Sequence, residues 1–161
     1  MDSIRKKDML KFYKPEIKDL RFRKKMLEDE ETMSYNHAYG GTISFPEDKW
    51  EDWYERWLKD PSGKHFYCYI TNDDTFIGEA AYRYIEQEDR YMIDVIIYAP
   101  YRGKGYGSEA LDLLCQTAKE NGIDVLWDDI AIDNPAIDMF LRHGFKEISR
   151  DEEEIDLRKE L

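Results

Sequence analysis

Hydrophobic positions recur with two different periods along the chain, and the change of period divides the sequence into two parts. In the first part they return every three to four residues, which predicts helices over 16–36, with a break near Asp29, and over 44–60. Apolar and polar residues then alternate, which predicts three strands at 64–71, 75–84 and 90–98. The separators NDD and IEQED are short enough for hairpins, so these strands should be antiparallel neighbours.

The remaining segments extend this pattern to a mixed α/β order. A short first strand is expected at 9–15, and the last third of the chain begins with a helix at 107–121. It is followed by a strand, a short helix in which Asn134 is the N-cap, and two closing strands, at 124–132, 134–145, 145–149 and 154–159. The predicted order is a meander, a strand–helix–strand crossover, and a final helix and hairpin.

Composition places the chain among globular proteins. Its 161 residues, 42% of them hydrophobic, suit a single domain over 1–161, and no apolar stretch approaches the roughly 20 residues of a membrane span. Cys68 and Cys115 make neither a disulfide framework nor a zinc site, so we expect a reduced, cytoplasmic protein without a metal. A net charge of −12 keeps the chain soluble, would attract cations and argues against nucleic acid. We expect no membrane partner, and a homodimer stays open.

One segment, YAPYRGKGYGSEA at 98–110, combines three glycines and two cations between an apolar strand and a helix. Glycine allows tight turns and lets a ligand approach the main chain closely. A helix that begins directly afterwards points its free N–H groups and the positive end of its dipole to the same place. This combination predicts an anion site, and a phosphate suits it best.

Two common phosphate-binding motifs fit this segment poorly. A Walker A loop is excluded because the lysine is followed by glycine instead of Ser or Thr. The dinucleotide fingerprint fits Gly105-x-Gly107-x-x-Ala110, with Asp128 or Asp129 about 20 residues further on. That fingerprint should open repeated strand–helix–strand units, whereas three meander strands precede it here, so the architecture argues against it.

A third motif, Arg102-x-x-Gly105-x-Gly107, follows a buried strand and opens a helix. Here the chain resembles the GNAT (Gcn5-related N-acetyltransferase) superfamily, whose Q/R-x-x-G-x-G/A loop binds the pyrophosphate of acetyl-CoA. Two further segments are similar to the family: IIYAP, where the strand ends close to proline, and NPAIDMFLRHGF, where an Asn starts a short helix that ends in Gly-Phe. The resemblance runs from about residue 65 to 148 and implies a GNAT-like α/β fold, with a mixed, mostly antiparallel sheet of six to seven strands flanked by about four helices.

The resemblance also implies which residues bind the cofactor, acetyl-CoA. The loop would bind the pyrophosphate through Arg102, Gly103, Lys104, Gly105, Tyr106, Gly107 and Ser108. In the family the strand before the loop diverges from the next strand, and its exposed backbone pairs with the pantetheine arm; this role falls on Ile96, Ile97 and Tyr98. Asn134 and Phe140, in the Gly-Phe helix, complete the expected cofactor contacts.

Acetyl transfer to an amine needs a base, because an alkylammonium of pKa about 10.4 is almost entirely protonated at neutral pH. Asp94 is the leading candidate, since a carboxylate within an apolar strand should have a raised pKa. In some GNAT enzymes a carboxylate at a comparable distance before the loop is the base. Asp128 and Asp129 lie on the next strand, and alternation turns one of them to the cleft. We name Asp94 and Asp129 as catalytic candidates and Asp94 and Asp128 as substrate contacts; the alternative is that each only caps backbone or pairs with arginine.

Tyr35 and Trp53 are the remaining candidates for acceptor binding. Trp53 belongs to a stripe of tryptophans on one helical face. Such a stripe is either core or an aromatic wall that favours a cationic amine.

The proton donor for the departing CoA thiolate is the one clear departure from the family. The family often has a Tyr four residues before the Gly of Gly-Phe, and this sequence has Phe140 there. The donor is then absent, a water, or Tyr98, our third catalytic candidate. We predict an N-acetyltransferase that moves the acetyl group of acetyl-CoA to a primary amine on a small cationic acceptor. The alternatives are a non-catalytic acyl-CoA-binding module and a dinucleotide-binding oxidoreductase.

Overall fold

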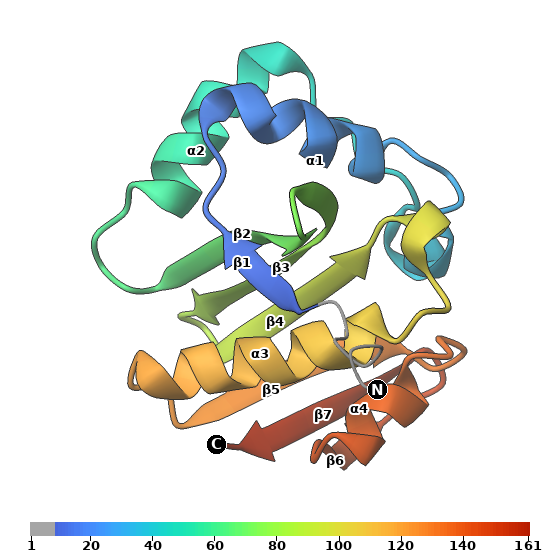
Figure 1. Cartoon of the computed structure of the whole chain (residues 1–161). Helices are drawn as coiled ribbons and strands as arrows, with labels where there is room; N and C mark the ends of the chain where they lie inside the picture. The colour runs from blue at the N-terminus through green and yellow to red at the C-terminus, as the bar shows by residue number, and fades with distance from the viewer. Residues whose placement is uncertain (1–8) are drawn as a thin grey trace, which may run out of the picture.

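The computed structural model describes residues 9–161, and its strands form one seven-stranded sheet (Figure 1). The strands are β1 (Leu10–Tyr13), β2 (His65–Asn72), β3 (Thr75–Ile85), β4 (Arg90–Ile97), β5 (Val125–Ala131), β6 (Lys146–Arg150) and β7 (Glu154–Glu160). Their spatial order is β1-β2-β3-β4-β5-β7-β6, and every neighbouring pair is antiparallel except β4 with β5. Residues 1–8 of the predicted domain lie outside the described residues.

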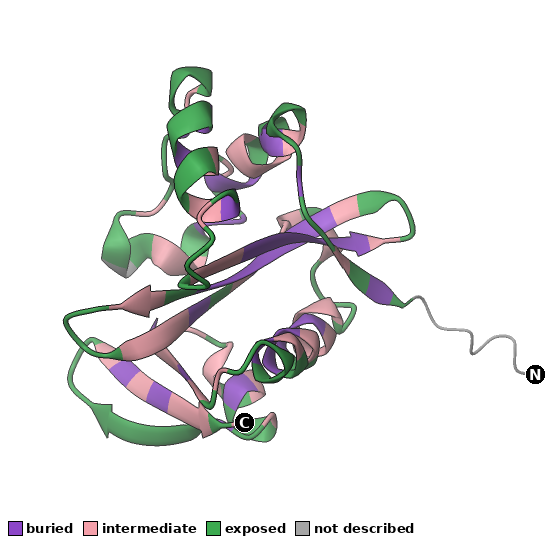
Figure 2. Ribbon diagram, turned by 90° about the vertical axis from the view of Figure 1, so that its left-hand side faces the viewer, coloured by how far each residue is buried: buried purple, intermediate pink, exposed green. Residues whose placement is uncertain are grey.

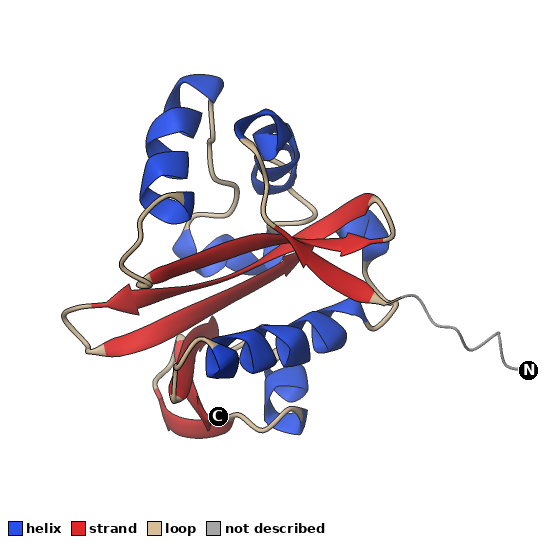
Figure 3. Ribbon diagram, turned by 60° about the vertical axis from the view of Figure 1, so that its left-hand side comes forward, coloured by secondary structure: helices blue, strands red, loops and turns tan. Residues whose placement is uncertain are grey.

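Helices cover both faces of this sheet (Figure 3). One face carries α1 (Leu20–Leu27) and α2 (Trp50–Leu58), and the other carries α3 (Tyr106–Glu120) and α4 (Ile137–Arg142). Short 3₁₀ turns connect the elements: η2 (Ile17–Asp19), η3 (Ser34–Tyr39), η4 (Glu47–Lys49) and η5 (Ala99–Tyr101). The predicted α/β fold, with six to seven strands and about four helices, is confirmed.

Two predicted helices are shorter than their patterns suggest. Of the segment 16–36, which was expected to be helical, only α1 is an α-helix. The break near Asp29 is confirmed. There the Asp29 carboxylate accepts hydrogen bonds from the N–H and the hydroxyl of Thr32, a local motif that competes with helix. Asn134 does not cap α4 directly: its Oδ1 accepts from the N–H of Ala136 at 2.8 Å, and the helix begins at Ile137.

Two hydrophobic cores lie on opposite faces of the sheet, and Figure 2 shows the buried positions concentrated along the strands. The core under α3 includes Leu111, Leu114 and Phe140. The core under α1 and α2 includes Trp50 and Trp53, so the tryptophan stripe faces the sheet. Because both faces are covered, the central strands are fixed in position around the site described below.

Both cysteines, Cys68 and Cys115, are buried free thiols. No helix in the part of the chain that the structure describes is long and apolar enough to cross a membrane. Within residues 9–161, no group of three or more His, Cys, Asp or Glu side chains is arranged to hold a metal ion.

Gly78 marks the closest backbone contact between β3 and β4. A Cβ at this position would lie 2.2 Å from the carbonyl oxygen of Ile96, and neither central strand can move away without disturbing its register. We expect Gly78→Ala to lower the free energy of unfolding by about 2–3 kcal/mol, measured by urea denaturation. Gly107→Ala is the control, because its Cβ would meet the Met139 sulfur at an ordinary 3.5 Å. An equal loss in both variants would contradict the steric explanation.

Candidate active site

The divergence of β4 and β5 creates a deep cleft. The two strands pair in parallel at only two positions, Tyr91 with Leu126 and Met92 with Trp127, and then separate. The cleft between them has a volume of about 1190 Å³ and is lined from η3, β4, the loop before α3, β5 and α4. This exceeds the ~300–1,000 Å³ typical of ligand sites, so the cleft has room for more than one small ligand.

One backbone edge of β4 faces this cleft. The N–H of Tyr98 donates to the carbonyl of Ile77 at 2.9 Å, so Tyr98 and, by alternation, Ile96 direct their backbone groups to β3. Val95 and Ile97 therefore point theirs into the gap. Of the three residues predicted to pair with pantetheine, Ile97 has the required orientation, and Val95 was missed because only the β3–β4 register identifies it.

The glycine-rich loop turns sharply into the first turn of α3. Gly103 and Gly105 have φ of 79° and 84°, in the left-handed region that glycine adopts without strain. A Cβ at either position would meet nothing within 4 Å, so the loop leaves open space above its main chain. The first N–H groups of α3 lack intrahelical partners and point to that space. All predicted loop residues line the cleft except Lys104.

Arg102 lines the cleft, but its guanidinium is engaged by the protein. Nε donates to the carbonyl of Ile97 at 3.0 Å, and the two terminal nitrogens donate to the carbonyls of Glu31 at 3.2 Å and Thr32 at 2.6 Å. The same group lies 5.4 Å from the Tyr35 ring centroid. Arg102 therefore ties the end of β4 to the segment that precedes η3, which forms one wall of the cleft.

Three aspartates border the cleft from the two diverging strands. Asp94 lies on the face of β4 that α1 and α2 cover, because Ile96, two residues on, packs into that core. Asp129 and Asp128 are neighbours on β5, so their side chains point to opposite faces. Asp128 shares its face with Ile130, which packs into the core under α3.

Asp94 is accessible through the open cleft, while protein surrounds it on the other sides. This burial raises the pKa of its carboxyl to about 6; the negative charge of Glu79 adds to the rise, and Arg83 and Arg23 oppose it. A base with a pKa of about 6 is deprotonated at neutral pH and still accepts a proton readily.

The two aspartates of β5 differ in their partners. Burial raises the pKa of Asp128 well above its usual range, and the charges of Asp94 and Asp129 add to the rise. Burial also raises the pKa of Asp129 to about 7, assisted by a hydrogen bond with Asp156, its cross-strand partner on β7. Arg90 lies 3.5 Å from Asp129 and 3.3 Å from Asp156. Asp129 is therefore paired with an arginine, which was the alternative to a catalytic role.

Trp53 belongs to the core and does not line the cleft. Its exposed fraction is 7%, and the Arg23 guanidinium lies 4.3 Å from its ring centroid and 4.5 Å from that of Phe45. Arg23 in turn lies 3.5 Å from the buried carboxylate of Glu79, which accepts a hydrogen bond from the Tyr67 hydroxyl. The aromatic rings therefore bind a cation of the protein itself. Of the two roles considered for Trp53, the structure supports the one in the core.

Of the remaining predicted site residues, three line the cleft and Tyr98 does not. Tyr35 lines the cleft, and burial raises the pKa of its hydroxyl. Asn134 and Phe140 line the cleft from the α4 side. The ring of Tyr98 packs edge-on against Phe22, with centroids 5.8 Å apart, and is not among the cleft-lining residues. The structure therefore gives no support to Tyr98 as the proton donor.

Two contacts of η3 join residues that line the cleft, and the sequence did not predict them. The Tyr39 hydroxyl donates to the Glu154 carboxylate of β7, and His37 Nε2 lies 3.1 Å from Asp133 Oδ2. These partners are 115 and 96 residues apart in the sequence, so no local pattern joins them.

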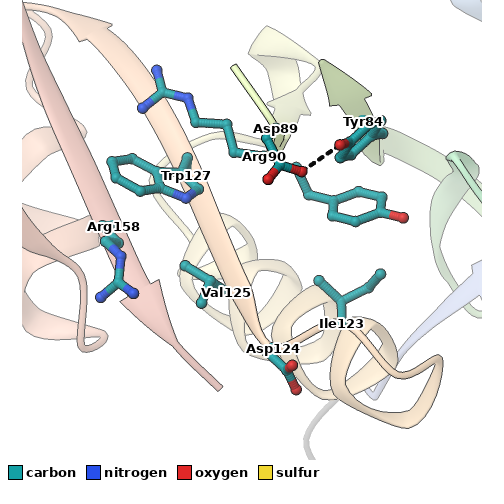
Figure 4. Close-up of a pocket in the computed structure, with 9 residues that line it drawn as sticks. Tyr84, Asp89, Arg90, Ile123, Asp124, Val125, Trp127 and Arg158 are labelled. Carbon is teal, nitrogen blue, oxygen red and sulfur yellow. Dashed lines mark hydrogen bonds between the residues drawn. The ribbon is translucent and has the colours of Figure 1, made fainter. Parts of the chain in front are cut away.

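A smaller hollow of about 340 Å³ lies beside the paired ends of β4 and β5 (Figure 4). Its polar groups contact one another: the Tyr84 hydroxyl donates to Asp89, and the guanidinium carbons of Arg90 and Arg158 lie 4.3 and 5.5 Å from the Trp127 ring centroid. Its lining contains no glycine loop or helix N-terminus. The larger cleft is therefore the candidate active site.

Residues 10–146 match the family model of the acetyltransferase (GNAT) domain, so the chain belongs to the GNAT family of acetyltransferases. The resemblance inferred from the loop and the predicted enzyme class are confirmed. The dinucleotide-binding oxidoreductase is wrong, since the sheet contains one parallel pair, not a run of strand–helix–strand units.

Solved structures share this fold at low sequence identity. Spermidine N-acetyltransferase from Vibrio cholerae, in complex with CoA and spermine, is 17% identical with a TM-score of 0.79, over 94% of this chain and 95% of that one. The GNAT domain of S. lividans PAT is 15% identical (TM-score 0.75, 94% and 89% covered). The PaiA N-acetyltransferase from Thermoplasma acidophilum, in complex with coenzyme A, is 16% identical (TM-score 0.69, 94% and 99% covered). Among curated proteins, none matches the chain.

The three carbonyl contacts of Arg102 predict a structural role that can be measured without any ligand. The single nitrogen of a lysine cannot span acceptors that three separate guanidinium nitrogens contact, so Arg102→Lys should lower the free energy of unfolding by about 1–2 kcal/mol. Amide exchange should accelerate at residues 31–35 because their anchor is lost. Lys104→Ala, which removes the neighbouring cation, is the control. Unchanged exchange in Arg102→Lys would refute the anchoring role.

Proposed function

We propose that the chain works as a single catalytic domain that transfers the acetyl group of acetyl-CoA to a primary amine on a small cationic acceptor. The observation that carries the proposal is one cleft that joins the anion-binding start of α3 to the Asp94 carboxylate. The CoA complexes of two similar folds, and spermine in one of them, support both halves of the reaction. Buried free thiols suit the reducing cytoplasm as the site of action.

The cofactor half of the cleft fits a pyrophosphate and an extended arm. The N–H groups of residues 103–107 and the dipole of α3 would bind the phosphates in the open space above Gly103 and Gly105. The N–H groups of Val95 and Ile97 that face the gap would bind the amide groups of pantetheine, which would take the place of a neighbouring strand. This places the thioester in the gap between β4 and β5.

The acceptor half of the cleft is acidic. Asp94, Asp129 and Glu154 line it, and the chain as a whole carries a net charge of −12. A cationic amine is attracted to this field, and its ammonium must lose a proton before it can attack the thioester. Asp94 accepts that proton, directly or through one water, and returns it to solvent. Tyr35 borders the same region and contributes an apolar ring with a protonated hydroxyl.

Gly105 provides a direct test of the cofactor half. Acetyl-CoA should raise the melting temperature of the native protein, since a ligand that binds only the folded state stabilises it. Gly105→Glu should abolish that rise, because it adds a negative charge beside the phosphates. Gly105→Asn is the matched control: it keeps a residue that tolerates φ near 84° without the charge and should retain part of the rise. A full rise in Gly105→Glu would place the cofactor elsewhere.

Asp94 provides the test of the acceptor half. As a base it works deprotonated, so kcat/KM in the native protein should rise with pH through about 6. Asp94→Asn should lose this step and lower kcat/KM by about 10²–10⁴, measured as thiol release with a panel of amines. The loss should shrink at pH 9.5, where more amine is neutral. An equal loss at pH 7 and pH 9.5 would assign Asp94 a structural role, and binding of acetyl-CoA without turnover would favour the non-catalytic module.

A further inference from the structure

The reaction proposed above releases a thiolate, and neither Phe140, at the family's donor position, nor Tyr98 supplies a proton to it. Phe140 lines the cleft without a hydroxyl, and the Tyr98 ring packs against Phe22 outside it. The pKa of a thiol, about 8.5, lies about 1.5 units above neutral pH, so a proton donor increases the rate by a factor of about 30. A group that carries a proton at neutral pH and borders the gap between β4 and β5 would provide it.

Asp128 has the position for this role. It follows Trp127, the last residue of β5 that pairs with β4, and so stands where the two strands begin to separate. Its side chain lies on the same face of β5 as Ile130, toward the core under α3, the helix whose first turn carries the cofactor loop. Asp94 lies on the opposite face of β4, toward α1 and α2. The two carboxyls therefore flank the gap, one on the cofactor side and one on the acceptor side.

The surroundings of Asp128 favour the protonated form of its carboxyl. Burial, the largest cause, raises its pKa well above the usual range; the charges of Asp94 and Asp129 add to the rise, and Arg83 opposes it. Arg90 contacts Asp129 and Asp156, and no ion pair of Asp128 is found among the described residues. A neutral carboxylic acid carries an O–H donor, which a carboxylate lacks.

We propose that Asp128 is the general acid of the transfer and protonates the sulfur of CoA as the carbon–sulfur bond breaks; this rests on the proposed function. The neutral amine nitrogen attacks the thioester carbonyl and forms the carbon–nitrogen bond. The tetrahedral intermediate collapses, the electron pair of the carbon–sulfur bond moves to sulfur, and the Asp128 O–H proton follows it. The second proton of the nitrogen leaves through water and restores the Asp128 carboxyl, so the products are an amide and a neutral thiol.

Asp94 and Asp128 then divide the proton transfers between them. Neighbouring carboxyls whose environments separate their pKa values can act as base and acid in the same reaction. Asp94 is open to the cleft, and the charges of Arg83 and Arg23 oppose that of Glu79 on its carboxyl, whereas Arg83 alone opposes the charges of Asp94 and Asp129 on Asp128. The position of Phe140 on α4 is consistent with this division, because no hydroxyl is needed from that side of the cleft.

The test combines Asp128→Asn with Phe140→Tyr. Asp128→Asn keeps the size and polarity of the side chain but has no acidic proton, so kcat at saturating acetyl-CoA and amine should fall about 30-fold. The KM for the amine should change less than about threefold, because the acceptor is held elsewhere. Phe140→Tyr in the Asp128→Asn background should restore about tenfold, since a phenol now reaches the cleft from α4. Asp124→Asn, on the same chain segment but outside the cleft, is the charge-matched control.

Three outcomes overturn the assignment. Asp128→Asn with native kcat shows that Asp128 donates no proton in the rate-limiting step. A raised KM for the amine with kcat unchanged shows that Asp128 binds the acceptor ammonium. A fall in kcat that Phe140→Tyr does not relieve, in variants with native melting temperatures, shows a role other than proton donation. Absence of amine turnover in the native protein would refute the proposed function itself, and Asp128 as its acid with it.

Discussion

The brief pairing of β4 with β5 is the constraint on which the whole site depends. If the register of Tyr91 with Leu126 continued, Asp94 would stand opposite Asp129 on one face of the sheet. Like charges directly opposite each other destabilise a pair of strands. Two carboxyls at this point do not favour continued pairing, and both of them line the cleft that opens beyond Met92 and Trp127.

A diverging strand leaves main-chain groups without sheet partners, and the protein supports β4 from its other side. Gly78 lets β3 approach the Ile96 carbonyl closely, and the β3–β4 register continues to Ile97 without a bulge. At the end of β4, the Arg102 guanidinium satisfies one carbonyl that faces the gap, that of Ile97. The N–H groups that remain are therefore held on a rigid edge, which is the preorganisation that an extended ligand requires.

The sequence predicted the elements and the loop because both depend on local patterns. Period, glycine spacing and hairpin lengths identified the seven strands, and the motif around Gly105 placed the glycine-rich loop at the start of α3. The partners of long side chains could not be predicted in this way. The carbonyl of Thr32 that Arg102 contacts lies 70 residues away, and the motif gives no indication of it. Val95 was missed for a related reason, since strand register is set by the whole sheet.

Trp53 shows why a correct pattern can still suggest a wrong role. The stripe of tryptophans predicts both a buried face and a surface that attracts cations. In the structure Trp53 is part of the core, and the cation beside its ring is Arg23. This arginine is held near Glu79, and both charges act on Asp94: Glu79 raises the pKa of the carboxyl and Arg23 lowers it. The aromatic rings that hold Arg23 thus influence the Asp94 carboxyl from a distance. A core interaction outside the cleft therefore affects the pKa of a carboxyl that borders it.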